Sequence, residues 1–316
     1  MVIKMTPKVF LELVELRTKI ASMTPFLLAN AYVLYHYKGF NLLNFILMLI
    51  SLLAVDMATT ALNNFQDYLT AKKKHGFNYE VHNAVVKYNL ASRTVFITII
   101  MLFSIAVVSG LLLYLRTDLL IILLGALSFL VGILYTSGPI PISRTPFGEV
   151  FSGFFMGFVI TFLTIYIQKS DLINLSLIGA KLNLTIIYPD LIRIFIFSFP
   201  LILEIAAIML ANNICDIKDD LSNNRYTLAT YLGKEKSLTI FSWLYYFSYL
   251  SVLAAILLNI VPVYAIIVFI SWPYLRKNIN IFKLKQNKKE TFVLAVKNFT
   301  IFNYLNLLAF LLAFIF

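Results

Sequence analysis

Long uninterrupted apolar runs constrain this chain more than any other feature. Runs of about 17 to 24 residues recur along the 316 residues, with short segments between them that hold most of the charges. A helix of about 20 apolar residues spans the hydrocarbon core of a bilayer, whereas membrane β-barrels need alternating segments of about ten residues. Because backbone groups inside a bilayer must be hydrogen-bonded internally, the runs predict an all-α, polytopic membrane helix bundle.

Composition agrees with this fold class and limits the partners. The chain is 60% hydrophobic and only 13% charged, whereas a soluble domain carries about 25% charged residues. Its single cysteine, Cys215, excludes an internal disulfide. The net charge of +11 could suggest nucleic acid. Because the cations fall in short segments between apolar runs, we instead expect the lipid bilayer as a partner and no nucleic acid.

The apolar runs predict nine transmembrane helices in a single domain of residues 1–316. Prolines and glycines from Gly138 to Gly148 break the helix between the fourth and fifth spans. The eighth span is short and contains Pro262 and Pro273. The expected spans are 20–36, 43–66, 93–114, 118–136, 148–167, 190–214, 238–258, 260–275 and 294–315.

The distribution of Lys and Arg predicts the orientation of the bundle. With the N-terminus in the cytoplasm, 21 of the 26 Lys and Arg residues fall in cytoplasmic segments or in the helix ends beside them, and five fall on the other side. This bias is typical of multi-pass proteins, so we expect the plasma membrane with a cytoplasmic active site. The cytoplasmic segments would be an amphipathic N-terminus at 1–19 and loops at 67–92, 137–147, 215–237 and 276–293.

Two Asn/Asp clusters end the second and sixth spans, both on the expected cytoplasmic side. The first runs from Asn63 to Asp67 and the second from Asn212 to Asp220. In the second cluster, Asn212, Asp216 and Asp220 recur every fourth residue, and each such step turns a side chain by only about 40° around a helix. The three side chains should therefore form a polar stripe on one helical face. Acids at membrane depth are costly and are functional candidates by default.

The chemistry of these clusters suits a divalent cation and a diphosphate. Mg²⁺ prefers one or two carboxylates together with substrate phosphates. We expect Asp67, Asp216 and Asp220 to bind two Mg²⁺ ions, with Asn63 and Asn212 as further metal ligands or as contacts to the diphosphate. Ions that bridge a diphosphate neutralise its charge as it leaves. With apolar helix faces below to accept a lipid tail, the pattern predicts a membrane enzyme that uses an isoprenoid diphosphate.

Plainer interpretations exist for several residues. A single Asn/Asp cluster would more often cap a helix or lie at the membrane surface, but two on one side favour a shared site. Asp56 lies about 16 Å deeper on the face of the first cluster, and is either a hydrogen-bonded interior acid or part of the floor of a cavity. Lys72 and Lys73 either anchor the topology or contact the diphosphate. The pair Gly153 and Gly157, in a Gly-x-x-x-Gly spacing, indicates close helix packing.

Longer motifs reveal a family resemblance. Residues 212–220, followed by Arg225 to Gly233, resemble the second Asp-rich motif of the UbiA superfamily of membrane prenyltransferases, and Asn63 to Asp67 resembles the first. Tyr135 to Pro141 and Thr145 to Glu149 are similar to the MenA-like branch that makes menaquinone. The likeness runs over nearly the whole chain.

The resemblance implies a nine-helix bundle around a central cavity, Mg²⁺ as cofactor and a polyprenyl diphosphate donor. It also implies an aromatic acceptor, which in the menaquinone branch is 1,4-dihydroxy-2-naphthoate. The acceptor ring would attack the ionised allylic chain and lose CO₂, giving demethylmenaquinone.

Further residues complete the expected substrate site. Tyr135 and Arg144, on the Pro/Gly segment, are expected to close over the diphosphate and exclude water. Arg225 would contribute to the anion site. Arg17 or Lys19 would meet the carboxylate of the acceptor.

The first motif departs from the family pattern. Asn64 replaces an expected acid, and Ala71 and Lys73 occupy positions where another acid would fall. The first metal would then have fewer carboxylates, and cations such as Lys72 or Arg225 would contribute more to binding the diphosphate. The second motif is intact, so an active enzyme is expected.

Two alternatives remain open at this point. A sister enzyme would use the same donor site with another aromatic or polyol phosphate acceptor. A transporter would also hold intramembrane acids, often in two similar halves. Nine spans do not divide into equal halves, however, and the clusters lie at the cytoplasmic edge of the membrane and not at its midplane.

Overall fold

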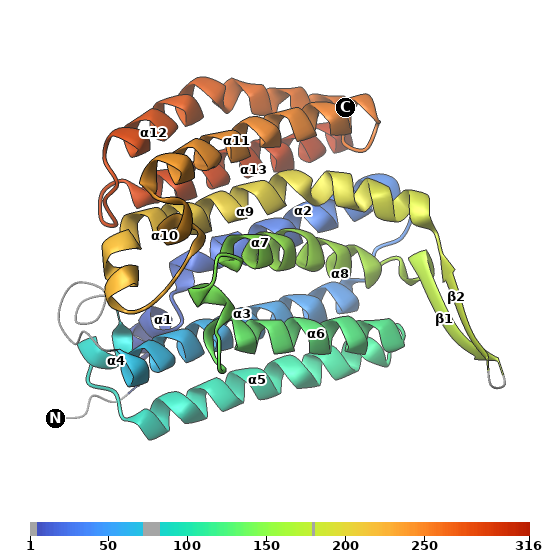
Figure 1. Ribbon diagram of the computed structural model, residues 1–316. Coiled ribbons are helices and arrows are strands. Elements are labelled where there is room, and N and C mark those ends of the chain that lie inside the picture. Colours follow the sequence, from blue (N-terminus) through green and yellow to red (C-terminus); the bar gives the residue numbers. More distant parts are fainter. Residues whose placement is uncertain (1–4, 72–82, 179–180) are drawn as a thin grey trace.

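The computed structural model describes residues 5–71, 83–178 and 181–316, which form a bundle of long helices lying alongside one another (Figure 1). The predicted all-α class is confirmed. Among the described residues, seven helices are long and apolar enough to cross a membrane. At one end of the bundle lie the N-terminal segment and the C-terminal ends of α3 and α9, while a β-hairpin projects from the other end (Figure 1).

Helices of the first half lead up to the hairpin. They are α1 (Pro7–Leu13), η1 (Leu16–Lys19), α2 (Ile20–His36), α3 (Leu42–Thr70), α4 (Ala84–Lys87), α5 (Ser92–Tyr114), α6 (Leu119–Thr136), η3 (Ile142–Arg144), α7 (Gly148–Ser152), η4 (Gly153–Val159), α8 (Ile160–Tyr166) and η5 (Ser170–Leu172). The second half contains β1 (Ile173–Ile178), β2 (Lys181–Ile186), α9 (Tyr188–Ser222), α10 (Leu228–Leu232), α11 (Lys234–Leu257), η6 (Val263–Ser271), α12 (Trp272–Leu284) and α13 (Phe292–Ile315).

The expected count of nine long spans is not reproduced in the described part of the chain. The expected first span corresponds to α2, which has only 17 residues. The expected eighth span, 260–275, is divided into a 3-10 helix, η6, and the α-helix α12. Pro273 lies in the first turn of α12, where its missing N–H costs nothing. The sequence prediction missed this division because hydropathy marks an apolar stretch without specifying the helix type.

Several helices continue past their apolar residues into segments expected to be loops. Helix α3 ends at Thr70, α9 ends at Ser222, and α12 covers 276–284 of the expected last loop. Polar side chains outside the hydrocarbon do not stop a helix. The end of α9 instead coincides with Asn224, whose φ of 55° lies in the left-handed region that Asn tolerates better than most residues.

The N-terminal segment packs on the protein. Thr6 caps α1 by accepting a hydrogen bond from the Val9 N–H, and Val9 and Leu13 are buried against α3, α4 and α5. On its polar side, Glu12 accepts hydrogen bonds from Lys87 at 2.6 Å and from Tyr88 at 2.7 Å. The amphipathic character expected for 1–19 is therefore used for contacts with α4 and its neighbours.

A short antiparallel β-hairpin joins the α8 region to α9. Strands β1 and β2 pair from Ile173 opposite Ile186 to Ile178 opposite Lys181. The sequence analysis did not anticipate these strands. Leu175, Leu177, Leu182 and Leu184 alternate with polar residues, which is the period-two pattern of a strand.

The end of the bundle that carries the hairpin is tied together by amide side chains. Asn44 on α3 donates to the Ile167 carbonyl at 2.7 Å and accepts from Arg116 at 2.7 Å. Gln168 donates to the Asn41 carbonyl at 3.1 Å and accepts from the Asn41 N–H at 2.7 Å. These bonds join the start of α3 to the ends of α5 and α8.

A close helix contact lies between η4 and α9. A β-carbon added at Gly157 would lie 2.6 Å from the backbone nitrogen of Ile202, and one added at Gly153 would lie 2.6 Å from the Ile202 carbonyl oxygen. The predicted role of the Gly-x-x-x-Gly pair in close helix packing is confirmed. Both glycines lie in a π-helical stretch. Because their partners are backbone atoms, a larger residue could be accommodated only by moving α9.

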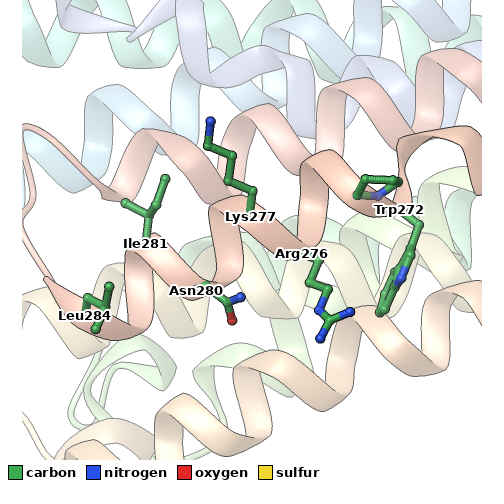
Figure 2. Close-up of a pocket in the computed structure, with 7 residues that line it drawn as sticks. Trp272, Arg276, Lys277, Asn280, Ile281 and Leu284 are labelled. Carbon is green, nitrogen blue, oxygen red and sulfur yellow. The ribbon is translucent and has the colours of Figure 1, made fainter.

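Two hollows lie away from the Asn/Asp clusters. One of about 470 Å³ lies on the outer face of α12, where Trp272, Arg276 and Asn280 project to one side and Lys277 to another (Figure 2). A small one of about 20 Å³ is lined by residues that include Leu28, Phe197 and Asn303. Neither is lined by the cluster residues, so the central cavity that the family resemblance implied stays a prediction.

Replacing Gly157 with Ala should destabilise the protein by about 1–3 kcal/mol, because the added methyl group overpacks the contact with α9. The measurement is the apparent midpoint of thermal unfolding in detergent. Gly125→Ala is the matched control, since a β-carbon at Gly125 on α6 meets no atom within 4 Å. Equal midpoints for the two variants would contradict the assigned role of the glycine contact.

Candidate active site

The second Asn/Asp cluster forms the last turns of α9. Asn212, Asp216 and Asp220 lie within one continuous helix, so they share a face as their spacing predicts. Asp220 is buried, with 4% of its surface exposed, while Asn212 and Asp216 are half-buried. The stripe therefore begins with a half-buried side chain, Asn212, and ends with a buried one, Asp220.

Each of the two acids in the stripe has a cationic partner. Asp216 forms an ion pair with Lys288, from the loop between α12 and α13. Asp220 lies 3.5 Å from Arg225 Nε and accepts a hydrogen bond from the Thr227 hydroxyl at 3.4 Å. The backbone N–H of Arg225 also donates to the Asp220 carbonyl at 2.9 Å, which holds the arginine beside the acid.

A buried amide fixes the rotation of α9 near the stripe. Asn213 donates to Glu149 Oε1 at 2.9 Å, and both side chains are buried. Glu149 lies in α7, directly before the glycine contact. Because Asn213 faces α7, the face of α9 that carries Asn212 and Asp216 is held in a defined orientation.

The first cluster lies in the last two turns of α3. Asn63 and Asp67 are half-buried. Asn64 is buried and donates to the Leu13 carbonyl at 3.0 Å and to Glu15 Oε1 at 3.1 Å, which ties the N-terminal segment to α3. The amide at 64 thus has a structural role where the family pattern has an acid. Lys72 and Lys73 lie outside the described residues.

The Pro/Gly segment bridges the two cluster-bearing helix ends. Arg144 donates from Nη2 to the Thr70 hydroxyl at 3.2 Å, at the end of α3. Its carbonyl accepts from the N–H of Tyr226 at 3.0 Å, just after α9. Tyr135 is placed at the same end, with its hydroxyl 3.5 Å from the Gly148 carbonyl oxygen. Segment 137–147 therefore contacts the end of α3 and the residues that follow α9.

Asp56 and Lys19 pair with each other inside the bundle. Lys19 Nζ donates to Asp56 Oδ1 at 2.6 Å, to the Asp56 carbonyl at 3.0 Å and to the Thr60 hydroxyl at 2.6 Å. Ser22 donates to the other carboxylate oxygen. The two side chains are only 4% and 17% exposed. Asp56 is thus a hydrogen-bonded interior acid in this structure, and all three ammonium protons of Lys19 are used.

Of the two cations expected to meet the acceptor carboxylate, Arg17 is the accessible one. Arg17 is exposed on η1, whereas Lys19 is buried two residues later.

A second interior acid, Glu204 on α9, is fully buried and accepts a hydrogen bond from Asn303 on α13 at 2.7 Å. Asp56 and Glu204 both form hydrogen bonds that join different segments of the bundle.

The side chains at the end of α9 fit a Mg²⁺ ion whose remaining coordination positions are filled by water and substrate. Within the described ranges, no group of three or more His, Cys, Asp or Glu side chains gathers closely enough to hold a metal by itself. Mg²⁺ commonly takes one or two carboxylates and completes its shell with water and substrate phosphates. Asp216 and Asp220, one helical turn apart with the Asn212 amide beyond them, supply such a set from α9.

Comparison with known proteins decides the family. Residues 22–307 match the family described as the UbiA prenyltransferase family. The chain belongs to this family. It is 29% identical over 266 residues to 1,4-dihydroxy-2-naphthoate octaprenyltransferase of Bacillus subtilis, covering 83% of this chain and 78% of that protein. The UbiA-family protein is therefore a prenyltransferase, and the transporter alternative is set aside.

Solved structures of UbiA homologues share the fold. A homologue from Archaeoglobus fulgidus, bound to GPP and Mg²⁺, has a TM-score of 0.64 and 12% identity, covering 96% of this chain and 98% of that one. A homologue from Aeropyrum pernix K1 has a TM-score of 0.63 and 19% identity, covering 90% and 97%. At these identities the likeness shows a shared fold and carries no statement about activity.

Sequence reasoning placed Arg225 at the site but missed the other partners of the acids. Lys288, Thr227 and the pair of Asn213 with Glu149 were not singled out as site residues. The lysines at 285, 288 and 289 were counted only as positive charges of a cytoplasmic loop. Thr227 and Glu149 were quoted within family motifs without a role. A sequence signal for Lys288 does not exist, because its contact with Asp216 spans 72 residues.

Replacing Lys19 with Met should destabilise the protein by about 3 kcal/mol or more, because it leaves Asp56 buried without its cation. The double variant Lys19→Met/Asp56→Asn should recover much of this loss, since no buried charge then remains. Arg17→Met, at an exposed position, is the control. The measurement is thermal unfolding in detergent, and a double variant less stable than Lys19→Met would count against a structural pair.

Proposed function

We propose that this UbiA-family protein transfers a polyprenyl group from a polyprenyl diphosphate to 1,4-dihydroxy-2-naphthoate in a Mg²⁺-dependent reaction. The observation that carries the proposal is the stripe of Asp216 and Asp220 at the end of α9, with Arg225 and Lys288 beside it. Each acid has a cation beside it, so this place offers both carboxylates for a metal and cations for a diphosphate. By the Lys and Arg distribution, this end of the bundle faces the cytoplasm in the plasma membrane.

The donor site is supported by chemistry and by likeness to a solved structure. The homologue from Archaeoglobus fulgidus is bound to GPP and Mg²⁺. In this protein, Asp216, Asp220 and Asn212 would hold the metal from α9, and Asp67 and Asn63 would do so from α3. When bound, Mg²⁺ neutralises the negative charge that develops on the departing diphosphate.

The remaining polar residues would bind the diphosphate and exclude water. Arg225 can donate to diphosphate oxygens while it stays anchored through its backbone to Asp220. Arg144 lies between the ends of α3 and α9 and would close over the headgroup with Tyr135. Shielding the site in this way protects the allylic cation from water until the acceptor ring attacks it.

The acceptor assignment is supported by the relative from Bacillus subtilis, whose name specifies 1,4-dihydroxy-2-naphthoate. Arg17 is the accessible cation on the N-terminal segment and would meet the acceptor carboxylate. Attack by the ring carbon that bears this carboxylate, followed by loss of CO₂, would give the hydroquinone form of demethylmenaquinone. Another aromatic acceptor would use the same donor site.

Replacing Asp216 or Asp220 with Asn should lower the rate of prenyl transfer at least about 100-fold, because each change removes a metal carboxylate. Asp171→Asn is the matched control. Asp171 is exposed, lies at the hairpin end of the bundle and pairs with Lys169. Removal of divalent cations with EDTA should abolish transfer, and added Mg²⁺ should restore it. Equal rates for Asp216→Asn and Asp171→Asn would overturn the site assignment.

Purified protein supplied with Mg²⁺, a polyprenyl diphosphate and 1,4-dihydroxy-2-naphthoate should release CO₂ and diphosphate and give a product with the mass of the hydroquinone of demethylmenaquinone, which oxidation in air converts to demethylmenaquinone. Parallel reactions with 4-hydroxybenzoate and with a polyol phosphate test other acceptors. Transfer to one of these, and none to the naphthoate, would keep the donor site and reject the acceptor assignment. Arg17→Met should raise the KM for the naphthoate and leave that for the donor unchanged.

A further inference from the structure

The loop between α12 and α13, residues 285–291, places a lysine directly on a metal-site carboxylate. Lys288 Nζ pairs with Asp216 Oδ2, and the two side chains are 20% and 14% exposed. The ammonium also lies 5.9 Å from the centre of the Phe292 ring. The pair is therefore shielded from water on most sides but still reachable from the cytoplasmic end.

Hydrogen bonds within the loop hold Lys288 in place. Asn287 Oδ1 accepts from the backbone N–H of Lys289 at 2.9 Å and of Glu290 at 3.1 Å. The Asn287 N–H donates to the Thr291 hydroxyl at 2.8 Å, and the Asn287 carbonyl accepts from the Phe292 N–H at 3.0 Å. The loop is thus a compact turn, and Lys288 is presented to Asp216 by a fixed backbone.

A metal and this ammonium compete for the same carboxylate. Both are cations, and the partly buried position limits screening of their repulsion. A diphosphate removes the conflict, because its oxygens can accept from the ammonium while others bind the metal. A lysine side chain has a flexible stem of four carbons, so Nζ can leave Asp216 for a neighbouring anion while the backbone of the loop keeps its conformation.

We propose that Lys288 is a diphosphate-binding residue that couples metal binding to diphosphate binding. Without diphosphate, its ammonium competes with Mg²⁺ for Asp216. When Mg²⁺ and diphosphate bind together, the ammonium passes to a diphosphate oxygen. This inference rests on the proposed function. It adds the loop between α12 and α13 to the segments that carry Arg144 and Arg225, as a third part of the chain that supplies a cation to the donor site. It requires that metal alone binds weakly and that each ligand increases the affinity for the other.

The test measures binding in purified protein, with inorganic pyrophosphate as the probe. In Lys288→Met, the affinity for Mg²⁺ or Mn²⁺ alone should rise several-fold, because the competing cation is gone. The affinity for pyrophosphate at a fixed, saturating concentration of free Mg²⁺ should fall about tenfold or more, the loss expected for one charge-assisted hydrogen bond. Lys288→Arg should retain most of the pyrophosphate affinity. Thermal unfolding midpoints near that of the unmodified protein show that the variants are folded.

Lys285→Met is the matched control from the same loop. Lys285 is 62% exposed and pairs with Glu290, so both affinities should stay unchanged. If Lys288→Met lowers or leaves unchanged the affinity for metal alone, or keeps full pyrophosphate affinity, the inference is wrong. Asp216→Asn separates this failure from failure of the proposed function. If Asp216→Asn binds Mg²⁺ and pyrophosphate as tightly as the unmodified protein does, the metal site itself is misassigned.

Discussion

The contact between α9 and the glycine face of η4 determines where the acids of the candidate site lie. Gly153 and Gly157 let the backbone of α9 approach to a distance that no side chain would allow. Glu149, on the α7 helix that directly precedes η4, forms a buried hydrogen bond with Asn213 that fixes the rotation of α9. In a bilayer, close packing of small residues and interhelical hydrogen bonds replace the hydrophobic force that assembles soluble proteins. The acidic stripe is held in place by both.

Two ion pairs in this bundle, Lys19 with Asp56 and Lys288 with Asp216, differ in their surroundings. Lys19 and Asp56 form a closed pair, in which every ammonium proton has an acceptor inside the protein. Asp216 and Lys288 form a pair that is reachable on the lysine side, because the Lys288 side chain is 20% exposed against 4% for Lys19. Closed pairs stabilise contacts between helices, whereas a reachable pair can exchange partners. The same residue types therefore serve structure in one place and, in the function proposed above, ligand binding in another.

Features that depend on short-range patterns were predictable from the sequence. The apolar runs predicted the long helices, the four-residue spacing predicted the stripe on α9, and Gly153 with Gly157 predicted a close helix contact. Features that depend on contacts distant in the chain were not. The partners of Asp56 and Asp216 lie 37 and 72 residues away, and no local signal marks them. The division of the eighth span and the β-hairpin were missed because hydropathy alone does not distinguish an α-helix from a 3-10 helix or a short strand.

The Lys19–Asp56 pair has a consequence for how the chain enters the membrane. An isolated carboxylate on a helix such as α3 opposes its transfer into hydrocarbon. Lys19 is made by the ribosome before Asp56, and it sits at the start of α2, the preceding helix. The compensating charge is thus already at the bilayer when α3 is delivered, so that α2 and α3 can partition into lipid as a neutral helical hairpin.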